Sequence, residues 1–106
     1  MVSSTFTPGP WRRVGHRSIS AGAGLDTVTL CEVFSGGVGL AQADANEALI
    51  AAAPDLFAAA EAAAAVLAKG KWRLDSPDPE AVALYKLLRA LDLARGVGLA
   101  PGRAAS

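Results

Sequence analysis

The 106-residue sequence has few of the residue types that build metal centres and disulfides. It contains one cysteine, Cys31, and one histidine, His16. A single cysteine cannot form an internal disulfide, and these two residues with scattered carboxylates do not show the spacing of a metal-ligand set. We therefore expect a protein without metal or cofactor, in a reducing compartment.

The sequence also lacks an excess of charge of either sign. Ten basic residues balance ten acidic ones, which argues against the basic footprint of a nucleic-acid-binding protein and against an acidic mimic of DNA. No apolar run is long enough to span a membrane, and the N-terminal residues lack the basic segment and apolar core of a signal peptide. We expect a cytoplasmic protein, with neither a membrane nor nucleic acid as its partner.

Candidate catalytic residues are few. His16 and Cys31 could form a dyad across a hairpin, but no third group that would orient the histidine is identifiable. A lone buried cysteine is more often a small apolar side chain, so we expect this role for Cys31. The glycine-rich run over residues 35–39 lacks the patterns of phosphate-binding loops, which favours a connector. We expect that the protein is not an enzyme.

What the sequence does contain is an alanine-rich helical pattern over residues 43–69, broken once by Pro54. Asp44 and Glu47 have the spacing of a capping box, which predicts a helix start at Asp44. Because proline disfavours a helical conformation in the residue before it, the first helix should end or kink near Ala52. Pro54 then suits the first turn of a second helix.

The second helix and a third one each have an apolar side. In the second, the side chains at helical spacing are Leu56, Phe57, Ala60, Ala63, Ala64 and Leu67. Gly70 is its expected C-terminal cap. The third helix is predicted over residues 79–95, with Asp78 as its cap and Gly96 at its end. Its expected core-facing side chains are Leu84, Leu87, Leu88 and Leu91.

Two segments before the helices have strand character. Residues 11–19 and 27–34 are these segments, and the glycine-rich loop at 21–26 can reverse the chain between them. The pattern predicts an antiparallel hairpin over 11–34. A two-stranded hairpin is only marginally stable, so it must pack on the helices or gain a strand from another copy.

These elements predict an α+β fold, with a small N-terminal antiparallel β-hairpin or slightly larger sheet packed on three helices. The length suits one domain over residues 1–106. In that domain residues 1–10 form an arm whose order depends on Trp11, and residues 97–106 form a flexible tail.

Two stretches also carry a resemblance. The opening Thr7-Pro8-Gly9-Pro10-Trp11 and the run ANEALIAAAPDL over residues 45–56 resemble a group of small proteins encoded by tailed bacteriophages and prophages. That group has a TPGPW-like opening, short strands and an AN-x-x-LI-x-x-AP-x-LL helix. The resemblance covers roughly the first two thirds of the chain and departs at Phe57, where a second leucine is usual. It implies a phage context and no particular activity.

Two clusters combine tryptophan with basic residues. They are Trp11, Arg12 and Arg13, near His16 and Arg17, and Lys69, Lys71, Trp72 and Arg73. Such a composition is typical of a protein-interface hot spot and also of a weak contact with single-stranded nucleic acid. The structural alternative is that each tryptophan closes one end of the core while its neighbours stay solvated.

The third helix has more apolar surface than one neighbour can cover. Val82, Tyr85 and Leu93 lie outside the side formed by its core-facing leucines. We therefore expect a homodimer in which these three side chains lie at the contact, unless the hairpin covers them.

Three functions are compatible with these features. The first is a non-enzymatic phage accessory protein that binds a host or phage protein, for example to inhibit a host factor or a defence system such as a CRISPR effector complex. The second is a small nucleic-acid-binding regulator, which would need a clustered basic face. The third is a virion protein or another self-assembling structural protein.

Overall fold

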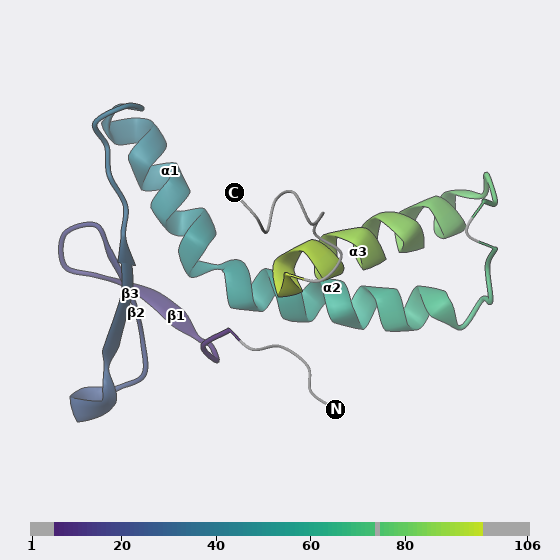
Figure 1. Ribbon diagram of the computed structural model, residues 1–106, viewed down its shortest axis with the longest axis horizontal. Coiled ribbons are helices and arrows are strands. Elements are labelled where there is room, and N and C mark those ends of the chain that lie inside the picture. Colours follow the sequence, from purple (N-terminus) through teal and green to yellow (C-terminus); the bar gives the residue numbers. More distant parts are fainter. Residues whose placement is uncertain (1–5, 74, 97–106) are drawn as a thin grey trace. The chain divides into compact units, whose positions relative to one another are not determined.

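A computed structural model describes residues 6–73 and 75–96. The described residues form two compact units, each treated by itself below: the sheet unit, Thr7–Leu56, and the helical unit, which joins Phe6 to the residues from Phe57 onward. Three strands precede three helices (Figure 1), which confirms the predicted α+β class. The prediction of one domain stays a prediction, and the expected tail over 97–106 lies outside the described residues.

The sheet unit contains a three-stranded antiparallel sheet with the order β1-β2-β3. The strands are β1 (Trp11–Val14), β2 (Ser18–Ala21) and β3 (Val28–Glu32). The short 3-10 helix η1 (Gly24–Asp26) lies between β2 and β3, where the glycine-rich loop predicted a reversal. The central strand is the buried one, since Ile19 and Ala21 are almost fully covered.

The predicted strand over 11–19 is two strands. Gly15 and Arg17 both have positive φ, at 59° and 67°, and this left-handed turn reverses the chain after β1. Trp11 consequently pairs with Ala21, and Val14 pairs with Ser18. The two-stranded hairpin is therefore wrong and the larger sheet is correct. A left-handed arginine is uncommon, which is why the residue types did not predict this turn.

Helix α1 (Leu40–Ala51) begins four residues earlier than predicted. Gly39, with φ 84°, occupies the cap position, and Asp44 lies in the second turn. The predicted capping box is therefore wrong. Glu47 is turned toward the sheet and buried, together with Ala43 one turn before it. This side of α1 packs against β1 and β2.

The predicted helix break is confirmed. Helix α2 (Ala53–Ala68) follows α1 after Ala52, with Pro54 in its first turn. The backbone stays hydrogen-bonded across the break, because the Ala52 carbonyl accepts from the Leu56 amide at 2.9 Å. None of the described helices is long and apolar enough to cross a membrane alone, although the bent pair α1 and α2 would qualify by length and composition.

The helical unit is built from most of α2 and from α3 (Pro79–Arg95). Helix α3 begins and ends as predicted: Asp78 occupies the cap position, and Gly96 ends the helix in the left-handed region with φ 81°. The core comprises Ala64, Leu84 and Leu91, with partly buried side chains packed against them: Phe57, Ala60, Leu67, Trp72 and Leu87.

Three side chains predicted to face this core do not. Leu56, Ala63 and Leu88 are exposed, because the packed sides of α2 and α3 are narrower than their apolar stripes. The cap prediction for Gly70 is also wrong, since the left-handed residue after α2 is Lys71, with φ 55°. Gly70 instead lies so close to the Trp72 indole that a Cβ atom there would collide with the ring.

Candidate protein-interaction surfaces

The Thr7-Pro8-Gly9-Pro10-Trp11 segment packs against the start of α2. The Trp11 indole Nε1 donates a hydrogen bond to the Thr7 carbonyl at 2.9 Å. A Cβ atom on Gly9 would lie 2.7 Å from Cβ of Pro54, so glycine is needed for this close approach. The two stretches that carry the phage-type pattern, one at the N-terminus and one at the helix break, therefore meet in the sheet unit.

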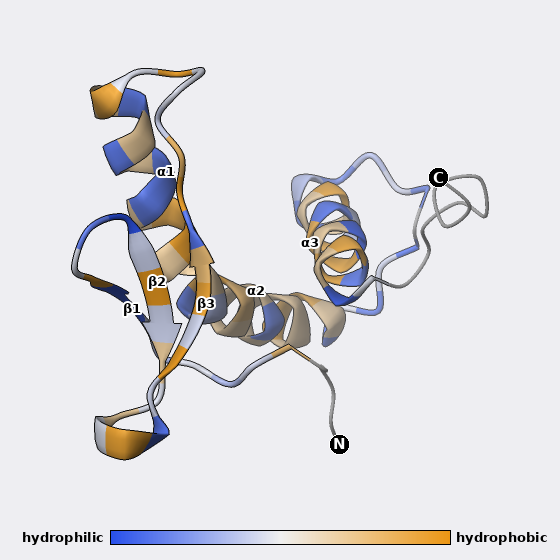
Figure 2. Cartoon of the chain, turned by 60° about the vertical axis from the view of Figure 1, so that its left-hand side comes forward, coloured by the Kyte–Doolittle hydropathy of each residue, from blue (hydrophilic) through white to orange (hydrophobic). Residues whose placement is uncertain are grey.

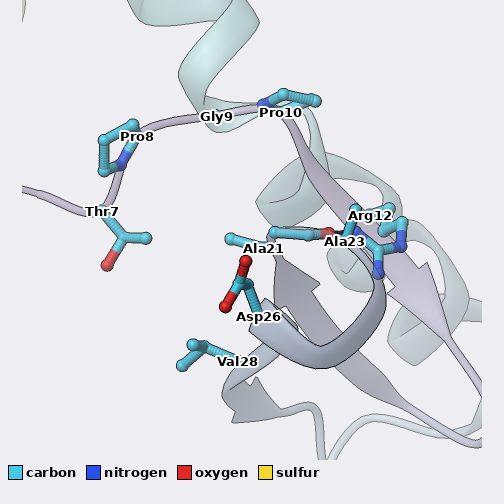
Figure 3. A pocket seen from close by; sticks show the side chains of 10 residues that line it. Thr7, Pro8, Gly9, Pro10, Arg12, Ala21, Ala23, Asp26 and Val28 are labelled. Atoms are coloured by element: carbon cyan, nitrogen blue, oxygen red, sulfur yellow. Dashed lines mark hydrogen bonds between the residues drawn. The ribbon is translucent and has the colours of Figure 1, made fainter.

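An open groove of about 570 Å³ lies beside this segment. Its walls come from the N-terminal segment and from the β2–β3 loop (Figure 3), and its lining residues are Thr7, Pro8, Gly9, Pro10, Arg12, Ala21, Gly22, Ala23, Asp26 and Val28. Most of these side chains are apolar or small. No feature of the sequence predicted this groove, because its two walls are distant along the chain.

The first predicted cluster does not form one basic patch. Arg12 donates to the Gly22 carbonyl and to Thr27 Oγ1, whereas Arg13 donates to Glu47 on α1 at 3.2 Å. Successive side chains of a strand point to opposite faces, so these two arginines lie on opposite sides of β1. Both are bound within the sheet unit.

Sequence reasoning missed an ionic cluster between the β1–β2 turn and α1. Arg17 Nη1 lies 2.6 Å from Asp44 Oδ1 and 3.2 Å from Glu47 Oε1. Arg13 Nη2 lies 3.2 Å from the same Glu47 oxygen. The spacing of the two carboxylates was a usable signal, but it was assigned to a capping box. The cluster holds the turn on α1.

His16 and Cys31 are both exposed. His16 lies in the β1–β2 turn and Cys31 lies on β3. The expectation of a buried Cys31 is wrong, because β3 is an edge strand and α1 packs on the other two strands. Within residues 6–73 and 75–96, no three His, Cys, Asp or Glu side chains are grouped closely enough to hold a metal ion. The absence of enzymatic activity stays a prediction.

The second predicted cluster lies in the turn after α2. Trp72 is half-buried and packs against the core of the helical unit. This packing agrees with the alternative in which the tryptophan closes one end of the core. Arg73 binds Asp75 through two nitrogens, at 3.1 and 3.2 Å. Lys69 and Lys71 are exposed. A binding role for either cluster stays a prediction.

The outward side of α3 presents apolar side chains. Val82, Tyr85 and Leu93 are 39%, 47% and 50% exposed, respectively. By helical spacing Val82 and Leu93 lie opposite the buried Leu84 and Leu91, and Tyr85 lies between the two sides. Lys86, Arg89 and Asp92 share their side of the helix, and Figure 2 shows hydrophobic and hydrophilic residues interleaved around α3. We call Val82, Tyr85 and Leu93 the α3 outer face.

Phe57, where the sequence departs from the phage-type pattern, is a contact centre of the helical unit. Its ring meets Phe6 edge to face, with centroids 5.1 Å apart. The Arg95 guanidinium lies 5.2 Å from the centre of the same ring and donates to Glu61 at 3.1 Å. A leucine could not provide either ring contact, so the phenyl ring of Phe57 helps to hold the end of α3 on α2.

Comparison with known protein families gives a match over most of the chain. The family model described as Salmonella phage P22 protein Y8K6 matches residues 1–97. No curated protein and no solved structure matches the chain. The family match covers both units and supports the phage context that the sequence implied. The chain therefore belongs to the family of Salmonella phage P22 protein Y8K6.

Proposed function

We propose that this protein is a non-enzymatic phage accessory protein that acts by binding other proteins. Its membership of a phage protein family supports a role during phage infection or lysogeny. The described residues contain no group of metal-ligating side chains, which is compatible with a binding role. The observation that carries the proposal is the α3 outer face, whose three large apolar side chains are about half exposed in the helical unit. Apolar side chains of this kind, rimmed by charged ones, are typical of a protein contact.

The arrangement of basic residues favours protein over nucleic acid as the partner. Arg13, Arg17, Arg73 and Arg95 each bind a carboxylate, so their charge is neutralised locally. A nucleic-acid interface needs unpaired cations gathered on one face. Among the described basic residues, the exposed pairs Lys69 with Lys71 and Lys86 with Arg89 are the nearest approach to such a group.

The proposed target is a host protein, in particular a host factor or a component of a defence system such as a CRISPR effector complex. The phage family supports this choice because a phage protein of this kind is made inside a host cell. On this proposal the chain acts in the host cytoplasm. Two separate clusters are the proposed contacts with that target, each taken by itself: Trp11, Arg12 and Arg13 in the sheet unit, and Lys69, Lys71, Trp72 and Arg73 in the helical unit.

Affinity capture from lysogenic host cells tests this function. The natural chain and a Lys69→Ala, Lys71→Ala double variant serve as baits, because these lysines are exposed and support nothing in the core. We expect the natural bait to recover one host protein in an amount nearly equal to that of the bait itself. The double variant should recover clearly less of that protein. Recovery of virion proteins alone would support the structural alternative. Recovery of nucleic acid at physiological salt, without protein, would support the regulator.

We further propose that the α3 outer face contacts a second copy of the chain. In an antiparallel pair of α3 helices with a two-fold axis at Arg89, Tyr85 faces the partner's Leu93 and Lys86 faces the partner's Asp92. This register joins Tyr85 with an apolar and Lys86 with an acidic side chain, as a self-complementary contact requires, whereas Val82 lies at the end of the contact. The two Arg89 side chains repel at the axis, which limits the dimer to moderate affinity.

A further inference from the structure

The groove beside the N-terminal segment is held open by contacts within the sheet unit. On one wall, Gly9 lies against Pro54 and the Trp11 indole binds the Thr7 carbonyl. On the other wall, Gly22 has φ 85° and lies so close to the Asp26 carbonyl that a Cβ atom would collide with it. These contacts fix both walls before any ligand arrives, so little ordering is needed on binding.

The groove has one carboxylate without a partner. Asp26 accepts no side-chain hydrogen bond from any residue in 6–73 or 75–96, and it projects into the space beside Thr7, Ala21 and Val28 (Figure 3). Arg12, the one basic residue in the lining, donates to the Gly22 carbonyl and to Thr27 Oγ1. The Arg12 guanidinium is thus hydrogen-bonded to the β2–β3 loop, and the Asp26 carboxylate is available to a ligand.

The ligand that fits this lining is a cation on an apolar stem. Lysine and arginine side chains place their methylene groups along apolar surface while the charged end reaches a polar partner. Here the proline rings, alanines and Val28 suit the stem, and Asp26 suits the charge through a charge-assisted hydrogen bond. An anion or a purely apolar group would leave this carboxylate unpaired or repel it.

The free edge of β3 indicates how such a side chain would arrive. Val28 is both a lining residue of the groove and the first residue of β3. The edge of β3 that faces away from β2 has no neighbouring strand in the described chain. An extended peptide can add to such an edge through backbone hydrogen bonds while a pocket reads one of its side chains.

From these observations we infer that the groove binds a lysine or arginine side chain of an extended partner segment that pairs with the edge of β3. The inference rests on the proposed protein-binding function and adds the chemistry of the partner. It assigns Asp26 as the residue that selects the positive charge. Apolar contact with Pro8, Pro10 and Val28 contributes without selecting charge.

Two capped five-residue peptides of threonine and valine test the inference, one with a central lysine and one with a central norleucine. Backbone amide shifts of the isotope-labelled full chain are followed during each titration. We expect the lysine peptide to shift the amides of Gly22, Ala23, Asp26 and Val28 and to bind at least about threefold more tightly than the norleucine peptide. Asp26→Asn, which is nearly isosteric, should abolish that preference. Glu32→Gln removes the same charge from the other end of β3 and should keep it.

Several results would overturn the inference. They are equal binding of both peptides, shifts confined to other regions, no binding, or a lysine preference that survives Asp26→Asn. Groove shifts that appear on concentrating the chain without peptide would point to a second copy instead and would also count against it. Affinity capture separates this inference from the proposed function: an Asp26→Asn bait that still recovers the host protein as well as the natural bait refutes the groove and leaves the function standing.

Discussion

Replacing Glu47 with alanine should weaken the attachment of the sheet to α1 more than any other single charge removal in the sheet unit. Its side chain is 6% exposed and accepts hydrogen bonds from Arg13 and Arg17, each at 3.2 Å. The substitution leaves both guanidinium groups without this carboxylate. It also removes the buried methylene groups that pack beside Ala43 on the same side of the helix.

The magnitude follows from the burial of each partner. Removing one member of a buried ion pair costs roughly 3–5 kcal/mol. Here Arg13 is 47% exposed and can regain water, and Arg17 keeps Asp44 at 2.6 Å. We therefore expect Glu47→Ala to lower the free energy of unfolding by about 2–3 kcal/mol, somewhat less than that range. Glu47→Gln, which retains the shape and one acceptor, should cost about half as much.

Urea unfolding followed by Trp11 fluorescence measures this loss in the sheet unit. A Trp72→Phe background removes the tryptophan of the helical unit, so the remaining signal comes from Trp11. With the expected loss, the midpoint should fall by on the order of 1 M urea. Asp44→Ala is the matched control, because Asp44 binds the same Arg17 but is 63% exposed and should cost no more than about 1 kcal/mol. Equal losses for Glu47→Ala and Asp44→Ala would refute the assignment of Glu47 as the buried anchor.

Three further predictions concern close contacts and charge. Gly9→Ala places a methyl group 2.7 Å from Pro54 and should cost about 1–3 kcal/mol in thermal unfolding; unchanged stability would contradict that contact. Gly70→Ala should displace the Trp72 indole and shift its fluorescence toward that of exposed tryptophan, whereas an unaltered spectrum would argue against their close approach. Binding to mixed-sequence DNA should be weak and lost at modest salt, because the net charge is zero; tight binding at physiological salt that depends on the basic residues of 69–73 would reverse the ranking of functions.

The sequence predicted best where single residues restrict the backbone. Pro54 marked the break between α1 and α2, and Pro79 with Gly96 marked both ends of α3. Proline cannot donate an amide hydrogen bond and glycine readily adopts positive φ, so these boundaries depend little on the rest of the fold. The exposure of Tyr85 likewise followed from helical periodicity alone.

Prediction failed where distant parts of the chain decide the outcome. The spacing of Asp44 and Glu47 fits a capping box and a pair of partners for distant arginines equally well, and only the packing of the β1–β2 turn on α1 selects the second. Arg17 holds a left-handed conformation that its residue type disfavours. The groove around Asp26 was missed for the same reason, since its walls are brought together by the contact between Gly9 and Pro54 and by the tight β2–β3 loop.

Sedimentation velocity at micromolar concentration tests most directly whether the α3 outer face is a protein contact. The chain has a mass of 10.7 kDa, and we expect the natural chain to sediment as a species of twice that mass. Tyr85→Glu should return it to the monomer by placing a charge in the contact. Ala83→Glu, which adds the same charge at an exposed position on another side of α3, should leave the dimer intact. A natural chain that stays monomeric, or a dimer that both substitutions disperse equally, would show that the α3 outer face is not the contact between copies.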